Sequence, residues 1–370
     1  MESSFTLGRI LGVRIGLHYT WLLAWALISW SLARGYFPVN YPGWAASSYW
    51  ITGIASALLL FVSVLAHELC HAAVALARGL TVESITLFIF GGVANIRDES
   101  RNARDEFLIA VVGPFASFAV AGLAWLIDLA VPDTGSPLDA LLNYLTLVNA
   151  VLGLFNLLPG FPLDGGRVLR AAVWGWTQSM ARSTRIASYV GQTVALLFIA
   201  YGFSEVLDGN VFGGLWIGLI GWFLNSAAGA TRRESELREI TSGVTVSEIM
   251  QRNPPTISPA VTVRELVEDH LLKHGTRAFP VIRNGDIAGI VSLTDVKRLP
   301  RERWDQDTVG AIMTRTGLRI VSPDRDVHAA LRALVEHNVN QLLVIEDGFL
   351  VGMLSRGDVM RYLQMREQLG

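Results

Sequence analysis

Two histidines and a glutamate stand together in a stretch of the chain where ionisable side chains are rare. His67 and His71 are four residues apart, so on a helix both imidazoles lie on one face and can bind one metal ion. Glu68 lies beside them, where it can accept a proton from water. This H-E-x-x-H spacing is a signature of zinc hydrolases, so the residues indicate metal-assisted hydrolysis.

The motif follows an uncharged run, Ile51 to Ala66, that is typical of a membrane span. An ionisable side chain at the centre of such a span costs about 2.5–3.5 kcal/mol on insertion scales, so it persists mostly where it pairs or binds. We therefore interpret the motif as a metal site inside the bilayer rather than a chance match in a soluble helix. Cys70 is the only cysteine, and we interpret it as a small buried residue.

The composition is that of a membrane protein. Of the 370 residues, 51% are hydrophobic and 17% are charged, and the mean hydropathy is +0.41. Soluble domains usually carry about 25% charged residues. A formal net charge of −2 argues against a nucleic-acid partner. The segment from Met1 to Arg14 lacks the pattern of a cleavable signal, so we expect the first apolar stretch to be a span.

Charged residues divide the first 231 residues into six candidate spans, each near the ~20 residues that cross a bilayer. One lies before His67, and the others lie between Arg14 and Arg34, Glu106 and Asp128, Asp139 and Asp164, Arg185 and Glu205, and Asp208 and Arg232. Basic residues gather in alternate connections, which places both termini in the cytoplasm by the positive-inside rule. His67 precedes Arg78 by 11 residues, about 16 Å of helix, so the metal should lie within the bilayer toward the cytoplasmic side.

A hydrolytic zinc site needs a third protein ligand and an open position for water, and Asp164 is the candidate. It follows the fourth apolar stretch, where Pro159, Gly160 and Pro162 break the helix. Asp164 can point back toward the histidines, or it can simply cap the helix that begins near Gly165.

Asn156 is the other polar residue of this wall. Its side chain is either a structural amide bonded to a neighbouring helix or a donor to the oxyanion of a tetrahedral intermediate. The residues alone leave both interpretations open.

Together these motifs resemble the site-2 proteases, which are zinc intramembrane metalloproteases. The family pairs H-E-x-x-H in one membrane helix with N-x-x-P-x-x-x-x-D-G in a later one, and the matching residues here are His67, Glu68, His71, Asn156, Pro159, Asp164 and Gly165. The resemblance covers about residues 5–230. It implies one zinc ion per chain, bound by the two histidines and the aspartate. It also implies that Glu68 is the general base for hydrolysis of peptide bonds in transmembrane substrates.

The segment from Phe88 to Ile96 is similar to the family's loop after the zinc helix, which enters the membrane as extended chain and aligns the substrate. The resemblance implies substrate contacts for Phe90, Gly91, Gly92 and Asn95. By itself, a glycine pair before a charged loop is often only a turn. Pairing with this segment would hold an unwound substrate helix open. Gly113 and Pro114 are also similar to a Gly-Pro of the family.

The polar segment 231–243 is interpreted as a linker, and after it the chain repeats with a period of about 63 residues, as Val246 and Val309 show. The two units, about 244–300 and 307–366, each show a lead-in, a helical pattern, two short strands around a tight turn, and a second helix. The helical patterns are Val263–Lys273 and Val327–Glu336.

This repeat resembles a tandem pair of cystathionine-β-synthase (CBS) domains, because both units end in G-h-h-S-x-x-D. In that family the Ser/Thr and Asp hold the ribose of an adenine nucleotide, and the matching residues here are Ser292, Thr294, Asp295, Ser355 and Asp358. The same spacing also fits plain N-capping of a helix. CBS pairs often dimerise, so a homodimer through these domains is compatible with the resemblance, and the sequence leaves the oligomeric state open.

We therefore expect a polytopic α-helical membrane domain with six transmembrane helices, residues 1–230, and a soluble α/β CBS module, residues 244–370. The expected protein is a multi-pass zinc endopeptidase of the cell membrane, with its CBS module in the cytoplasm. We expect ATP, ADP or AMP to bind the CBS module and to modulate proteolysis. The alternative is a CBS-gated transporter or channel, although the sequence lacks the repeated halves with broken helices that transporters usually show. An inactive scaffold is a third interpretation, and the complete ligand set argues against it.

Overall fold

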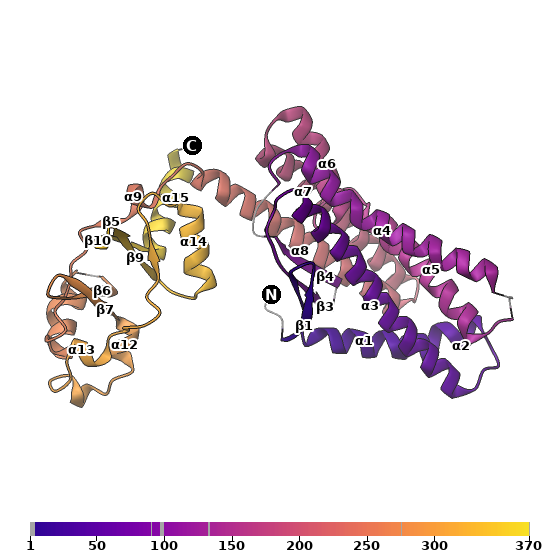
Figure 1. Ribbon diagram of the computed structural model, residues 1–370, viewed down its shortest axis with the longest axis horizontal. Coiled ribbons are helices and arrows are strands. Elements are labelled where there is room, and N and C mark those ends of the chain that lie inside the picture. The colour runs from indigo at the N-terminus through magenta and orange to yellow at the C-terminus, as the bar shows by residue number, and fades with distance from the viewer. Residues whose placement is uncertain (1–3, 90, 97–99, 132–133, 275, 370) are drawn as a thin grey trace. The chain divides into compact units, whose positions relative to one another are not determined.

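The computed structural model describes residues 4–89, 91–96, 100–131, 134–274 and 276–369 (Figure 1). The chain divides into two compact units, Met1–Ser235 and Glu236–Gly370. The first contains long apolar helices and one small sheet, and the second contains short helices and strands.

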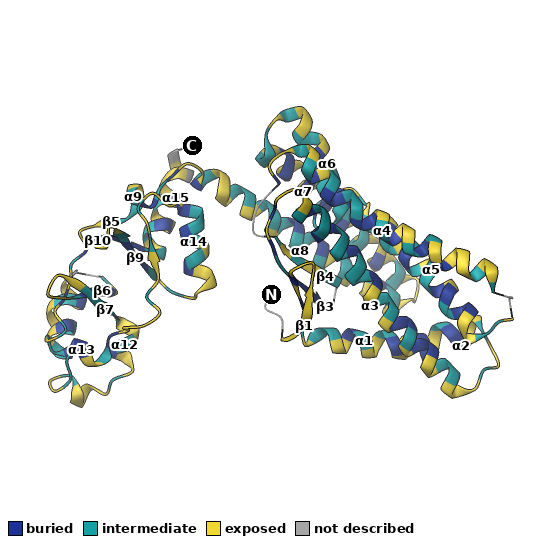
Figure 2. Ribbon diagram, in the orientation of Figure 1, coloured by how far each residue is buried: buried dark blue, intermediate teal, exposed yellow. Residues whose placement is uncertain are grey.

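Five helices among the described residues are long and apolar enough to cross a membrane. They are α3 (Ala46–Ala77), α4 (Ala103–Ala130), α5 (Pro137–Asn156), α7 (Met180–Leu207) and α8 (Val211–Thr241). Their large apolar side chains are mostly exposed, whereas small or polar residues are buried; in α7, for example, Leu197 is 64% exposed and Ser188 is fully buried. Figure 2 shows exposed positions along α4 and α5. Helices that pack through small residues and turn apolar ones outward suit a lipid solvent.

The expected first span is helical, but in three consecutive pieces. These are α1 (Thr20–Ser31), the π-helical turn η1 (Leu32–Tyr36) and α2 (Phe37–Asn40). None of the pieces is long enough alone to be counted among the membrane-crossing helices. The count of six spans therefore stays a prediction.

A four-stranded sheet packs against the helix that carries the histidines. Its order is β1 (Phe5–Ile10), β2 (Val13–Leu17), β3 (Val82–Phe88) and β4 (Gly91–Ile96), with β2 and β3 parallel and the other pairs antiparallel. Val13, Ile15 and Ile85 bury one face of the sheet against Ala72 and Ala75 of α3. The hairpin β3–β4 follows α3 directly, and β4 is an edge strand.

The Pro/Gly segment after α5 breaks the helix as expected. The chain leaves α5 at Asn156 and begins α6 (Asp164–Thr177) at Asp164. Gly160 has φ +137°, and its neighbour Phe161 lies so close to α7 that a Cβ on Gly191 would be 2.1 Å from the Phe161 carbonyl oxygen. This close backbone contact fixes the position of the loop that precedes Asp164.

In the second unit the two repeats form two sheets with flanking helices. The first repeat contains α9 (Val246–Ile249), β5 (Gln251–Arg252), α10 (Val263–Glu265), η2 (Leu266–Leu271), α11 (Leu272–His274), β6 (Ala278–Arg283), β7 (Asp286–Ser292) and α12 (Leu293–Lys297). The second contains α13 (Val309–Ile312), β8 (Ile320–Val321), α14 (Val327–Glu336), β9 (Gln341–Glu346), β10 (Phe349–Ser355) and α15 (Arg356–Leu369), and the short helix η3 (Arg301–Arg303) precedes it. The predicted linker 231–243 is helical as far as Thr241, where α8 ends.

The lead-in segments are exchanged between the repeats. Strand β5 of the first repeat pairs with β10 of the second, and Thr314 of the second bridges to Ile290 of the first. Val246 lies in the hydrophobic core of the second repeat, and Val309 lies in that of the first. Both valines are fully buried, and burying such a side chain contributes about 1.5–3 kcal/mol. Each core is thus completed by the other repeat.

Candidate metal centre and active site

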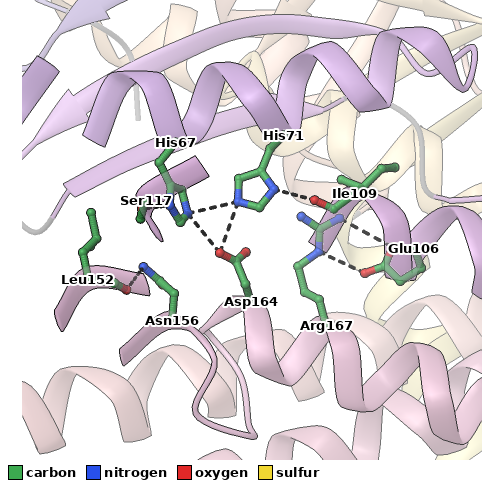
Figure 3. A network of polar contacts seen from close by, with 9 residues as sticks. All are labelled: His67, His71, Glu106, Ile109, Ser117, Leu152, Asn156, Asp164 and Arg167. Atoms are coloured by element: carbon green, nitrogen blue, oxygen red, sulfur yellow. Dashed lines mark hydrogen bonds and ion pairs between the residues drawn. The ribbon is translucent and has the colours of Figure 1, made fainter. Parts of the chain in front are cut away.

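Three side chains converge between α3 and α6. Nε2 of His67 lies 3.0 Å and Nε2 of His71 3.1 Å from the same Oδ2 of Asp164, and the two Nε2 atoms are 3.1 Å apart. Figure 3 shows the three side chains pointing toward one another. The two histidines, one helical turn apart on the buried face of α3, are 5% and 4% exposed. Asp164 reaches them because the break after α5 starts a new helix at this residue.

The second nitrogen of each histidine is also held. His67 Nδ1 lies 2.9 Å from Ser117 Oγ, and His71 Nδ1 lies 2.5 Å from the Ile109 carbonyl oxygen. Because a carbonyl can only accept, His71 donates from Nδ1, and in the neutral ring this leaves a lone pair on Nε2. Outer partners of this kind orient the histidines of metal sites.

The three donors fit a zinc ion. Ligands about 2.0 Å from zinc lie about 3.3 Å from one another in a tetrahedron, close to the separations observed here. Two imidazoles and one carboxylate are also a ligand set that catalytic zinc sites use, with a fourth position open. Within the described part of the chain, these are the residues grouped closely enough to bind a metal.

Glu68 lies next to the histidines and against the start of β4. A Cβ added to Gly92 would lie 2.5 Å from Glu68 Cγ, so only glycine lets the strand pass this close. Gly91 precedes it with φ +132°, a conformation that favours glycine. The structure therefore brings the start of the predicted substrate segment to the predicted base.

The other predicted residues of this segment lie farther along it or outside the description. Asn95 is exposed on β4, and its Nδ2 donates to Glu83 Oε2 at 3.1 Å across the β3–β4 pair. Phe90 lies outside the described residues.

Asn156 is the last residue of α5. Its Nδ2 donates to the Leu152 carbonyl oxygen at 3.0 Å, so in this conformation the amide nitrogen bonds within its own helix (Figure 3). The sequence predicts either a bond from Asn156 to a neighbouring helix or a bond to an oxyanion. The bond to Leu152 is neither of these.

Three residues of α4 complete the surroundings of the histidines; Gly113 was noted in the sequence for its family resemblance, whereas Ile109 and Ser117 were not predicted. Ser117 and Ile109 hold the histidines, and Gly113 lies between them on the same helical face. A Cβ on Gly113 would lie 2.1 Å from Nε2 of His71 and 2.6 Å from Nε2 of His67. The four-residue spacing of 109, 113 and 117 places these residues on one helical face and can be seen in the sequence. The acceptor at 109 is a backbone carbonyl, so the type of side chain gives no sign of it.

The second unit contains a separate polar cleft of about 1150 Å³, lined by the ends of both repeats. Asp295 Oδ2 accepts from Ser292 N at 2.8 Å and Ser292 Oγ at 2.7 Å. Asp358 Oδ2 accepts from Ser355 N at 2.9 Å and Ser355 Oγ at 2.6 Å. Both carboxylates thus serve as helix caps. The cleft is also lined by Thr294 and by six cations, Arg277, Lys297, Arg298, Arg319, Arg356 and Arg361.

Comparison with known proteins places both units. The sequence profile of peptidase family M50 matches residues 55–135 and 131–200, and that of the CBS domain matches residues 246–302 and 309–365. The chain is 34% identical to the protein sll0528 of Synechocystis sp., whose name assigns it provisionally to the zinc metalloproteases, over 98% of this chain and 96% of the relative. It is 32% identical to zinc metalloprotease MJ0392 of Methanocaldococcus jannaschii, over 100% of this chain and 99% of the relative.

A solved structure of a site-2 protease from Methanocaldococcus jannaschii is 31% identical and covers 62% of this chain and 95% of its own, with a TM-score of 0.44. The first M50 match contains His67, Glu68 and His71, and the second contains Asp164. The full-length relatives match the protease and the repeats together, which removes the alternative of a transporter or channel. The chain therefore belongs to the M50 peptidases, the site-2 protease family of membrane zinc metalloproteases, and carries a tandem pair of CBS domains.

Proposed function

We propose that the protein is an intramembrane zinc endopeptidase that cleaves peptide bonds in transmembrane proteins. The observation that carries the proposal is the convergence of three donor atoms, 3.0–3.1 Å apart, from His67, His71 and Asp164. They lie in a unit built from helices that can cross a membrane. Regulated intramembrane proteolysis is the process that this chemistry and location support.

His67, His71 and Asp164 would hold one zinc ion, which when bound acidifies water and polarises the scissile carbonyl. Glu68 accepts the proton of the attacking water and later gives it to the leaving amine. Asn156 would supply a hydrogen bond to the oxyanion after its amide leaves the Leu152 carbonyl. The buried surroundings of the histidines keep their rings oriented during both steps.

The edge strand β4 would bind the substrate. A helical substrate hides its carbonyl groups in internal hydrogen bonds, so it must unwind before cleavage. In the described sheet β4 pairs only with β3, so its outer edge offers backbone groups to an extended chain. Gly92 brings this strand close to Glu68. Gly91, Asn95 and Phe90 belong to the same segment.

We further propose six spans, with both termini and the CBS module in the cytoplasm. The consecutive helical pieces from Thr20 to Asn40 give the first stretch enough length to cross as one element. The alternation of basic loops supports the orientation. The catalytic centre then lies in the cytoplasmic half of the bilayer.

Replacing Asp164 with alanine should strongly weaken zinc binding and abolish cleavage, because the two histidines that remain bind the ion with too few ligands for a catalytic site. The measurements are zinc content of the purified protein and cleavage of a model transmembrane substrate in lipid vesicles. Asp208→Ala is the matched control, since Asp208 is an exposed aspartate at the end of α7. Full zinc and full activity in Asp164→Ala would show that the third ligand is misassigned.

The cleft of the CBS pair would bind ATP, ADP or AMP. Its six cations suit phosphate groups, and the Ser–Asp pairs of both repeats face it with acceptors for a ribose. A nucleotide can alter proteolysis only if it binds more tightly to one arrangement of the protein than to another. A homodimer through the CBS domains would be compatible with this role.

Asp295→Ala combined with Asp358→Ala should weaken nucleotide binding by more than tenfold, because both ribose acceptors are lost; one hydrogen bond to a charged group is worth about 1.5–3 kcal/mol. Calorimetric titration of the full-length protein and cleavage assays with nucleotide would measure this. Each change also removes a helix cap, worth about 0.5–2 kcal/mol of stability. Asp326→Ala controls for that loss, because Asp326 caps α14 away from the cleft. No binding at millimolar nucleotide would leave the module as a dimerisation or docking element.

A further inference from the structure

A buried carboxylate on α4 contacts the helix that carries the third ligand. Glu106 is 1% exposed. Its carboxylate accepts from Ser100 Oγ at 2.6 Å and from Arg167 Nε at 2.9 Å, and it also pairs with Arg170. Both arginines lie on α6, and Arg167 follows Asp164 by one helical turn (Figure 3).

The same face of α4 holds the other two ligands directly. Glu106, Ile109, Gly113 and Ser117 are spaced by three, four and four residues, which places them in one row along the helix. Ile109 and Ser117 bond the second nitrogens of the histidines. Among the described residues, Asp164 is hydrogen-bonded to the two histidines and not to this row, so α4 is linked to it through Glu106 and the two arginines.

The segment before Asp164 is held by the same cluster. The Arg170 guanidinium lies 5.1 Å from the centre of the Phe161 ring, which is 6% exposed. Phe161 is three residues before Asp164, and Arg167 is three residues after it. Both sides of the ligand are therefore connected to Glu106, in addition to the backbone contact between the loop and α7.

We propose that Glu106 is a positioning residue for the metal: through Arg167 and Arg170 it fixes the start of α6 so that Asp164 meets His67 and His71. Metal-binding geometry must be held within about 0.5 Å by supporting contacts, and the ion pairs of Glu106 supply such contacts on the helix that begins with Asp164. Loss of the Glu106 charge leaves two arginines beside Asp164 without their shared partner. The inference rests on the zinc site proposed above.

The test is zinc affinity of the full-length protein, measured by competition with a chelator. Glu106→Gln should weaken zinc binding by about 10–100-fold, as loss of outer-shell partners does at other metal sites. The absorption spectrum of the cobalt-substituted protein should change as well. Asp105→Asn is the matched control: it breaks the neighbouring Arg78–Asp105 pair of 3.4 Å on the same turn of α4 and should leave the affinity unchanged.

A double-mutant cycle distinguishes positioning from general support of the fold. Because Glu106 acts through Asp164, adding Glu106→Gln to Asp164→Ala should weaken zinc binding no further. An additive loss would overturn the proposal, as would normal zinc affinity in Glu106→Gln accompanied only by a lower melting temperature. If Glu106→Gln does not fold, Arg167→Lys keeps the charge but removes the Nε donor. Arg167→Lys should weaken zinc binding less than Glu106→Gln does, and it should have no further effect when combined with Asp164→Ala. The same loss of zinc affinity with and without Asp164→Ala would overturn the proposal.

The two proposals fail in different ways. Unchanged affinity in Asp164→Ala would overturn the zinc site itself. A strong loss in Asp164→Ala together with no loss in Glu106→Gln would overturn only the positioning role of Glu106.

Discussion

Replacing Glu68 with glutamine should reduce peptide cleavage by about 10²–10⁴-fold or more while the protein keeps its zinc. Glutamine has nearly the same shape as glutamate, but its amide cannot accept the proton of the attacking water. Glu68 is also absent from the three converging ligands, so the metal should not depend on it. The measurements are zinc content and the single-turnover rate of cleavage of a transmembrane substrate in vesicles.

Glu234→Gln makes the same chemical change at an exposed position of α8 and should leave cleavage intact. Near-normal cleavage by Glu68→Gln would exclude Glu68 as the base. Loss of zinc in Glu68→Gln would instead make Glu68 a residue that supports the ligands.

Replacing Gly113 with alanine should expel zinc and abolish activity, even though the change adds one methyl group. The new Cβ would lie 2.1 Å from His71 Nε2, closer than real Cβ contacts come. The histidine rings cannot simply turn away, because their other nitrogens are bonded to Ile109 and Ser117 on the same helix. The expected result is loss of bound zinc with the helical circular dichroism signal unchanged.

Gly122→Ala provides the control on the same helix, because a Cβ there meets nothing within 4 Å. Alanine is favoured over glycine in a helix by about 1 kcal/mol, so this variant should be at least as stable as the parent. A Gly113→Ala protein that retained zinc and activity would mean that α3 and α4 are farther apart in the membrane than the structure places them.

The ligands of the metal were predictable because their signals are local. His67 and His71 are one turn apart, and the prolines and glycine before Asp164 mark a helix break that needs no distant partner. The family resemblance then predicted that the segment with the histidines and the segment with Asp164 bind the same metal ion. The structure places all three donors together, although their roles remain a proposal.

The sheet beside the zinc helix was only partly predictable. An extended segment at 88–96 was expected, but β2 and β3 are far apart in the sequence and pair in parallel. Such pairing depends on contacts that no short pattern encodes. The same limit applies to Glu106, whose charge marked the edge of a predicted span while its partners Arg167 and Arg170 lie about sixty residues later.

The repeats illustrate a different limit. The helical pattern Val327–Glu336 coincides with α14, because an apolar face recurring every three to four residues is visible in sequence. The exchange of the lead-in segments could not be predicted from the sequence. The segments around Val246 and Val309 have similar apolar residues, so either segment could pack into either core. Only the chain path decides that Val246 enters the second core and Val309 the first.

This exchange makes the pair, rather than the single repeat, the unit of folding. A polypeptide ending before Val309 would lose Val309 and Met313 from the core formed by its own strands, and it would expose the apolar side chains they cover. The second repeat alone would likewise lack Val244 and Val246. The free energy of either core therefore includes residues of the other repeat. The two cannot unfold one after the other as independent domains, and a change that loosens one core reduces the stability of both.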